Sequence, residues 1–437
     1  MSEHLIPEIR LPSGLSRREF LRLSAATAGI AGLTALGPLD RLIPAAYGAP
    51  LSLKRLVVLN CFGGNDTLNM FVPVTLSPYY SRRVGLALPA NQCLSINAGP
   101  HATASYMLHP SMPKTAALWA AGQVAAVNRV GYPTANLSHF TSMDIFSYGI
   151  RGSFSSLGIP ASGWIARFCD EFAPTPLGAV AVNVGRPRDI VGGTTSPLPV
   201  STLAGFKVLG AGSGGGQYTP AHFHRLATAK KLIDGFAGTG RPQAQREALQ
   251  QAHDLTTQVQ SALTSYVSGA TYSTERLSQQ MRDIAVLIQG GFESRIFYTG
   301  FGGFDTHSAQ GTTAGAQATL FSQLDNALGS FSDDLKSMGV WNDTVVLVIT
   351  EFGRRNYVNG SDGTDHGHAF TALVLGGAVE GGVHGPNLTD ADLNSEYPNY
   401  AVDFRSIYKE ILADHMGLDP ARVFPEPLAI ENSLGLV

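Results

Sequence analysis

The sequence is poor in charged residues and in cysteine. Only 14% of its 437 residues are Asp, Glu, Lys or Arg, whereas 44% are hydrophobic, which is typical of a well-buried globular protein and not of a disordered one. Three cysteines give no disulfide framework, although Cys93 and Cys169 could form one pair. The net charge is −3 and no basic block is present, so nucleic acid is not expected as a partner.

The N-terminal region lacks an apolar run long enough for a stable membrane span. It has instead twin arginines, Arg17 and Arg18, followed by a short Ala/Gly/Leu stretch and by small residues at 45–49. This pattern is typical of a twin-arginine export signal. We therefore expect residues 1–48 to be a signal peptide that engages the twin-arginine translocation machinery, and the mature protein, residues 49–437, to be periplasmic or secreted. Because this route usually carries folded proteins, the signal also favours a bound cofactor such as a metal.

In the rest of the chain, short apolar runs alternate with helical patterns. This alternation predicts a three-layer α/β/α sandwich with a largely parallel central sheet. The range 150–290 contains a Gly-rich loop and two polar helices, at about 221–236 and 243–266, and we expect it to form an insertion or cap over the sheet. The chain after the last long strand predicts a hairpin at 379–385. Buried strands are expected at 56–59, 123–131, 295–301, 345–349 and 371–377.

Acidic residues and histidines follow three of these strands. Asp66, Asp305 and Glu351 come shortly after the ends of three separate strands, and parallel strands end at one edge of a sheet. Two residues after Asp305, His307 has its side chain on the same face of an extended chain. The sequence thus predicts a pocket for a divalent metal, which can be Zn²⁺, Mn²⁺ or Ca²⁺. The predicted ligands are Asp66, Asp305, His307, Glu351, Asp365, His366 and His368.

A second polar group follows the strand at 123–131. Ser138 is a candidate nucleophile, or the N-cap of the helix that follows it. His139, beside it, is a catalytic residue, a metal ligand, a substrate contact or a part of the cap.

Several of these segments together resemble the domain of unknown function 1501 family. They are the twin-arginine signal, 63-GGNDTLN-69, 138-SHF-140, 303-GFDTHSAQ-310, 350-TEFGRR-355 and 363-GTDHGHA-369. The family is grouped with the alkaline phosphatase and sulfatase superfamily. The resemblance implies an alkaline phosphatase-like α/β sandwich with a bimetal site, and hydrolysis or transfer of phosphate or sulfate esters through a Ser, Thr or Cys nucleophile.

By position, Asp66 resembles the first-strand metal aspartate, and Asp305 with His307 resembles the Asp/His pair of one metal site. His366 or His368 resembles the late metal histidine. Glu351 falls where the superfamily usually has Asp followed by His, but here Phe352 follows, so the second site is incomplete or rebuilt with Asp365. Thr67 and Ser138 are both candidate nucleophiles. Arg354 or Arg355 can bind an anionic substrate bidentately, or both can lie at the surface.

These observations lead to two hypotheses of function. The first is an exported metal-dependent hydrolase of the phosphatase or sulfatase type, acting on a small anionic ester. The alternative is a non-catalytic exported binding or assembly protein that keeps the fold with a degenerate metal site. The cluster of carboxylates and histidines favours the enzyme, whereas Phe352 and the lack of a clear nucleophile favour the alternative.

Overall fold

The computed structural model describes residues 53–152, 162–206, 220–235, 241–428 and 433–437. The predicted signal peptide lies outside the described residues, as do residues 209–219 of the Gly-rich loop. The chain divides into two compact units, one of which includes residues 203–264 and the other residues 45–202 and 265–437.

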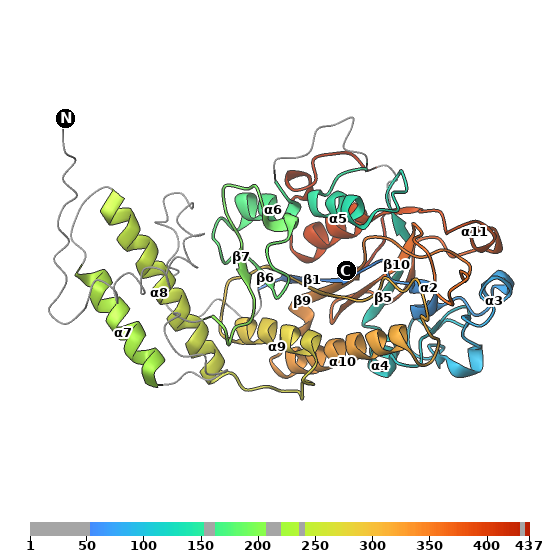
Figure 1. Ribbon diagram of the computed structural model, residues 1–437, viewed down its shortest axis with the longest axis horizontal. Coiled ribbons are helices and arrows are strands. Elements are labelled where there is room, and N and C mark those ends of the chain that lie inside the picture. The colour runs from blue at the N-terminus through green and yellow to red at the C-terminus, as the bar shows by residue number, and fades with distance from the viewer. Residues whose placement is uncertain (1–52, 153–161, 207–219, 236–240, 429–432) are drawn as a thin grey trace. The chain divides into compact units, whose positions relative to one another are not determined.

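The larger unit is built on a nine-stranded sheet with β1 (Arg55–Phe62) near its middle (Figure 1). Seven of the eight residues of β1 are buried, as its run of apolar residues predicts. The order across the sheet is β11 (Gly382–His384), β5 (Val124–Gly131), β10 (Phe370–Gly376), β9 (Thr344–Ile349), β1, β8 (Ile296–Gly302), β6 (Ala179–Val182) and β7 (Leu198–Val200), and β12 (Val402–Asp403) also pairs with β5.

The sheet is largely parallel, which confirms the predicted fold class. β1 runs parallel to both β8 and β9, and β6 runs parallel to β7 and β8. The exception is β10, which is antiparallel to β9 and β5. No helix lies between β9 and β10 along the described chain, and a parallel pairing needs a long crossover, so the chain returns in the opposite direction.

The predicted hairpin at 379–385 is wrong. β11 pairs in parallel with β5 and not with β10. Because β10 already has β9 on one side and β5 on the other, neither of its edges is free to accept a hairpin strand.

Helices cover both faces of the sheet and complete the three layers (Figure 1). Leu56 and Val58 of β1 belong to the same buried cluster as Phe168 and Ile407 from two helices of one layer. Val57 alternates with them, points toward the other layer and is also fully buried. One layer contains α5 (His139–Tyr148), α6 (Trp164–Phe172) and α12 (Phe404–Glu410), and the other contains α4 (Pro113–Ala120), α9 (Arg276–Gln289) and α10 (Ala316–Ser337).

The remaining elements of the larger unit are short. They are α2 (Thr67–Met70), α3 (Ser77–Arg82), α11 (Asp390–Asn394) and a small sheet of β2 (Phe71–Val72), β4 (Met107–Leu108) and β3 (Leu94–Ser95). Cys61, Cys93 and Cys169 are all free.

The range 150–290 contributes to both units. Its strands β6 and β7 extend the central sheet, and α9 contacts that sheet at β8. The smaller unit contains α7 (Pro220–Asp234) and nearly all of α8 (Arg241–Ser265), which confirms the two polar helices predicted there. Among the described helices, none is both long and apolar enough to cross a membrane.

Candidate metal centre

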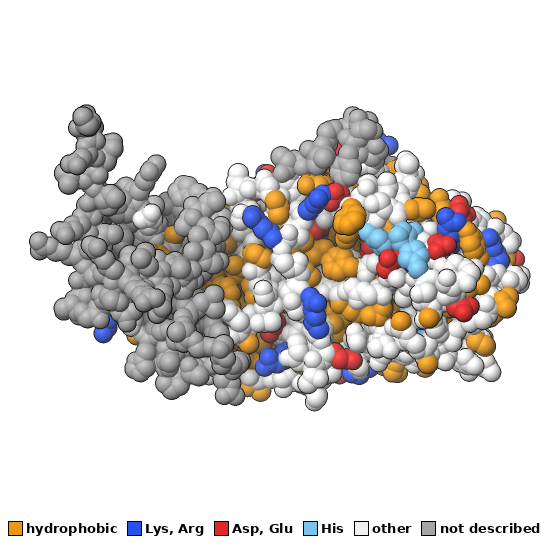
Figure 2. Space-filling view, viewed as in Figure 1, with side chains coloured by type: hydrophobic (Ala, Val, Ile, Leu, Met, Phe, Trp, Pro, Cys, Tyr) orange, Lys and Arg blue, Asp and Glu red, His pale blue; other side chains and the backbone are white. Residues whose placement is uncertain are grey.

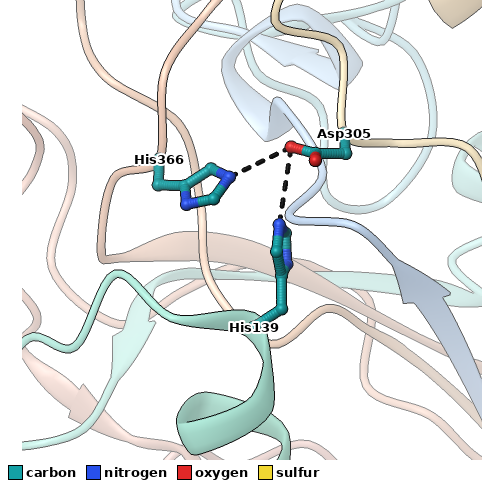
Figure 3. Close-up of side chains that lie close together, drawn as sticks. All are labelled: His139, Asp305 and His366. Carbon is teal, nitrogen blue, oxygen red and sulfur yellow. Dashed lines mark hydrogen bonds and ion pairs between the residues drawn. The ribbon is translucent and has the colours of Figure 1, made fainter.

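The loops after β1, β8 and β9 meet at one edge of the sheet, because these three strands run in the same direction. His139 reaches the same place from the first turn of α5. In Figure 3 the side chains of His139, Asp305 and His366 point toward one another. Their ligand atoms all lie within 4.8 Å of one another, close enough to share one metal ion.

One oxygen atom, Asp305 Oδ1, is the common neighbour of the cluster. It lies 3.0 Å from His307 Nε2, 3.0 Å from His366 Nε2 and 3.5 Å from His139 Nε2. The Nε2 atoms of His307 and His366 are 2.9 Å apart. Of the residues predicted from the sequence, the structure therefore brings together Asp305, His307, His366 and His139.

The other ring nitrogen of each histidine faces an oxygen. Carboxylate and carbonyl oxygens accept hydrogen bonds, so each Nδ1 carries a proton and the neutral ring has its lone pair on Nε2. The contacts from Nδ1 are His139 to Glu351 Oε1 at 2.6 Å, His307 to Asp365 Oδ1 at 3.1 Å and His366 to the Leu137 carbonyl at 2.7 Å.

This arrangement fits a divalent cation. Neutral rings direct three Nε2 lone pairs and one carboxylate oxygen at one another, and a cation between them satisfies all four. Metal-binding histidines commonly donate their second ring nitrogen to a carboxylate or carbonyl, as these three do. In addition, His139 Nε2 is buried and has no hydrogen-bond partner within the part of the chain that the structure describes.

The electrostatics of the cluster keep Asp305 ionised. Burial alone would raise the pKa of Asp305, but the hydrogen bond from the Arg354 guanidinium and the interactions with the neighbouring histidines outweigh it and lower the pKa to about 2. The hydrogen bond to Glu351 raises the pKa of His139, whereas burial lowers the pKa of His366. Asp305 is thus an anionic oxygen ligand at neutral pH.

Glu351 is a buried anchor for His139 and lies behind the cluster. Its Oε1 accepts hydrogen bonds from His139 Nδ1 and, at 2.8 Å, from the backbone N–H of Gly63. Gly63 has φ of +114°, and a Cβ there would lie 2.6 Å from the backbone nitrogen of Asp305. A side chain at Gly63 would therefore disturb both the anchor and the central ligand.

Phe352 packs against the imidazoles at the position where the family resemblance implied a histidine. Its ring centre lies 4.8 Å from that of His139 and 4.9 Å from that of His366. A Cβ at Gly64 would lie only 2.3 Å from the Phe352 ring, so glycine at that position makes room for it. Phe352 supplies no ligand, but it holds two of the candidate ligands in place.

Arg354 does not serve as a substrate-binding residue in this structure, because its guanidinium is buried and its N–H groups are used. It donates to the Gly64 carbonyl at 2.5 Å, to the Thr364 carbonyl at 2.8 Å and to Asp305 Oδ1 at 2.6 Å. These acceptors lie in the loops after β1, β9 and β8. Arg354 is therefore a clamp that holds the three loops together.

Asp66 lies apart from the cluster, contrary to the prediction that it is a metal ligand. Both its oxygens are bound by Arg83, with Nη1–Oδ2 at 2.7 Å and Nη2–Oδ1 at 2.9 Å. Gln310 Nε2 also donates to Oδ2 at 2.7 Å, and the Asp66 side chain is fully buried. Both oxygens of Asp66 are thus already bound by a cationic side chain of the protein.

His368 is also not part of the cluster, although it lies two residues beyond His366. It is buried, and its ring contacts the rings of Tyr132, Tyr397 and Tyr400. Burial lowers the pKa of His368 to about 4, so the ring is neutral at physiological pH. In an extended chain, His366 and His368 would have their side chains on the same side. The backbone bends between 366 and 368, where Gly367 lies against Arg354, so the two rings point to different places.

The two candidate nucleophiles differ in exposure. Thr67 is buried, and its hydroxyl accepts a hydrogen bond from the backbone N–H of Thr371 at 3.0 Å. Ser138 is exposed and is the N-cap residue of α5, but its side chain makes no capping hydrogen bond. It lies between Leu137, whose carbonyl binds His366, and His139. Ser138 is thus exposed and next to His139 along the chain, whereas the Thr67 hydroxyl is buried and bound to the backbone of Thr371.

The chain also matches solved structures, at low identity and low TM-score. A protein in the alkaline phosphatase superfamily from Vibrio parahaemolyticus has 14% identity and a TM-score of 0.36, with 93% of this chain and 78% of that chain covered. A sulfatase from Pseudoalteromonas sp. has 9% identity and a TM-score of 0.35, with 92% and 72% covered. The alkaline phosphatase from the Antarctic bacterium TAB5 has 11% identity and a TM-score of 0.32, with 84% and 99% covered.

A search of curated proteins gave no match. The family described as "Protein of unknown function (DUF1501)" matches residues 217–435, which include Asp305, His307, Glu351 and His366. Because the match covers half of the sequence, the chain belongs to this family.

Proposed function

We propose that this protein is an exported hydrolase of phosphate or sulfate esters that depends on one divalent metal ion. The convergence of three imidazole Nε2 atoms on Asp305 Oδ1 carries the proposal. The family resemblance implied two metal sites. The residues that the structure describes contain one group of candidate ligands at this separation, His139, Asp305 and His366. We therefore propose a single ion held by these three, with His307, whose Nε2 lies 3.0 Å from Asp305 Oδ1, as a fourth ligand.

The ligand set favours a particular class of metal. Three imidazoles and one carboxylate suit Zn²⁺ or Mn²⁺ better than Ca²⁺, which prefers six to eight oxygen ligands. Such an ion polarises a phosphoryl or sulfuryl oxygen and lowers the pKa of water.

Other residues of the chain would hold the reacting groups in place. Glu351 and Asp365 orient His139 and His307 through their Nδ1 atoms. Arg354 fixes Asp305 and ties its loop to the loop after β1. Ser138, which is exposed and next to His139 along the chain, is the hydroxyl that we propose as nucleophile, with water as the alternative.

One observation favours the non-catalytic alternative. Among the described residues, no Ser or Thr hydroxyl hydrogen-bonds to His139, Asp305, His307 or His366. A nucleophile of this kind normally lies within hydrogen-bond reach of its activating base, although such contacts are often longer in structures without substrate. Metal binding without ester hydrolysis would therefore identify a binding or assembly protein.

Hydrolysis is tested with the full-length protein purified after export, using 4-nitrophenyl phosphate and 4-nitrophenyl sulfate. We expect turnover of at least one ester, loss of turnover after chelation, and recovery when Zn²⁺ or Mn²⁺ is returned. His366→Ala should abolish turnover, whereas His101→Ala, a half-buried histidine elsewhere, should retain it. Turnover that survives both chelation and His366→Ala would contradict the proposal.

Export is tested separately from chemistry. The proposal rests on Arg17 and Arg18 and the short apolar stretch that follows them. Replacing both arginines by lysine should leave uncleaved precursor in the cytoplasm, as detected by fractionation. Unchanged export of that variant would contradict a twin-arginine route.

A further inference from the structure

A pocket of about 240 Å³ lies next to the metal centre, against α5. Three of its lining residues lie within two positions of His139 or of the residues that support it, Gly63 and Glu351, along the chain. Phe140 follows His139, Phe62 precedes Gly63, and Ile349 is two residues before Glu351. A molecule in this pocket would therefore extend toward the cluster. Figure 2 shows hydrophobic side chains exposed on the surface beside the histidines.

The charged groups that line this pocket already have partners, and among its described polar atoms the buried Asn60 Oδ1 has none. Asp189 is buried and accepts hydrogen bonds from Ser147 Oγ at 2.7 Å and from Trp164 Nε1 at 3.1 Å. Arg188 forms an ion pair with Asp144. Arg188 and Asp144 thus bind each other and Asp189 binds two neutral donors, so few polar groups of the pocket can recognise the many hydroxyl groups of a sugar.

The rest of the lining is apolar and largely aromatic, with Phe62, Phe140, Met143, Phe146, Tyr298 and Ile349 among its residues. The Phe140 side chain is 79% exposed, which is unusual for a large apolar side chain. Aromatic rings favour stacked or edge contacts with other rings. A cavity of roughly 150 Å³ can hold benzene, so a pocket of this size suits a group of one or two rings.

From these features we infer that the α5 pocket, defined by the lining residues above, binds the aromatic group of an aryl ester. The phosphate or sulfate of that ester would then lie at the metal centre. The inference rests on the proposed function for the ester bond, but binding of the aromatic group itself needs neither metal nor hydrolysis.

The test uses 2-naphthol and glucose as probes of the full-length protein, with and without chelation, by isothermal titration calorimetry. We expect 2-naphthol to bind in both states and glucose to give no detectable heat. Met143→Trp and Val184→Trp place a larger side chain at two half-buried positions of the lining, and each should weaken 2-naphthol binding at least ten-fold. Val267→Trp is the matched control, because Val267 is 75% exposed and lies outside the lining. The affinity of this variant for 2-naphthol should differ from that of the wild type by less than two-fold.

Thermal unfolding of each variant checks that it is folded. Two pocket variants are used so that the test can still be made if one of them does not fold. The wild-type protein alone also tests the inference. If it does not bind 2-naphthol, or if it binds glucose equally strongly, the inference is overturned. Unchanged affinity in a folded pocket variant would also overturn it. Binding of 2-naphthol without hydrolysis of 2-naphthyl phosphate or sulfate would leave the pocket standing and remove the proposed function. Ester hydrolysis without 2-naphthol binding would support the proposed function and overturn the inference about the pocket.

Discussion

Asp66 and Asp305 each come shortly after a buried strand, and both strands end at the same edge of the sheet. Their surroundings are nevertheless opposite. Asp66 is fully buried, and Arg83 binds both of its oxygens. Asp305 is about half exposed, and Oδ1 faces Arg354 together with three imidazoles.

This difference shows that the partner of a strand-end acid determines its role. A carboxylate bound by both nitrogens of a buried guanidinium has its charge neutralised and its geometry fixed, which makes it a structural group. A carboxylate that shares one oxygen with three neutral imidazoles is suited to a cation. Glu351 is a third case, because its carboxylate orients His139 from behind the cluster.

The largest effect on stability is expected from Asp66→Ala. The substitution leaves Arg83 buried without its counter-ion and should lower the free energy of unfolding by about 3–5 kcal/mol. Asp305→Ala also removes a counter-ion from a buried guanidinium, that of Arg354, but Arg354 keeps its carbonyl acceptors and Asp305 is half exposed, so the loss should be smaller, about 1–2 kcal/mol. Denaturant unfolding of both variants in the presence of chelator measures the difference. Equal losses of stability would contradict the distinction between the two acids.

The next effect extends the comparison to Asp189, a buried acid whose hydrogen-bond donors, Ser147 and Trp164, are neutral. Burial raises the pKa of Asp189 to about 6, so the folded protein binds this proton more tightly than the unfolded chain. The stabilisation that comes from this bound proton is greatest below about pH 4 and is lost as the pH rises through 6. The free energy of unfolding should fall by about 3 kcal/mol over this range relative to Asp189→Asn.

The measurement is denaturant unfolding of wild type and Asp189→Asn at several values between pH 4 and pH 7, again with chelator present. The difference between the two proteins isolates Asp189 from the other titrating groups. A difference that does not vary with pH, or that grows in favour of the wild type as the pH rises, would contradict this assignment.

A smaller effect is expected from the acid that orients a ligand. Glu351→Gln removes the charge behind His139 and keeps the size of the side chain, so metal affinity should fall about 10- to 100-fold. Glu396→Gln is the control, because Glu396 is half exposed and pairs with Arg355. Competition with a chelating dye measures both affinities. No change in the first variant would show that Glu351 does not support the metal site.

The smallest effect is expected at His368. This buried, neutral ring lies among tyrosines and not with the cluster, so His368→Phe should leave the metal content unchanged and alter stability by about 1 kcal/mol or less. Elemental analysis and denaturant unfolding measure the two quantities. Loss of the metal in this variant would show that His368 is a metal ligand.

The sequence predicted the parts of this centre that depend on strand direction. The buried runs at 56–59, 295–301 and 345–349 are parallel strands, and the convergence of Asp305, His307 and His366 follows from their common edge. The antiparallel β10 was not predicted, because a buried central strand has the same apolar pattern in either direction.

What the sequence could not predict is which side chains from distant segments meet. Arg83 and Gln310 occupy the oxygens of Asp66, and neither has a local pattern that indicates this role. The burial of Arg354 likewise depends on three loops meeting around it. The α5 pocket is lined from β1, β8, β9 and α5 together, so no single segment indicates it.

The most direct test of the central claim is X-ray absorption spectroscopy at the metal edge, on full-length protein whose metal content has been measured by elemental analysis. The account predicts one Zn²⁺ or Mn²⁺ per chain, with scattering from about three imidazole rings at ~2.0–2.2 Å and reduced imidazole scattering or metal loss in His366→Ala. A protein without bound metal, or a metal whose spectrum contains no imidazole and does not change in His366→Ala, would contradict it.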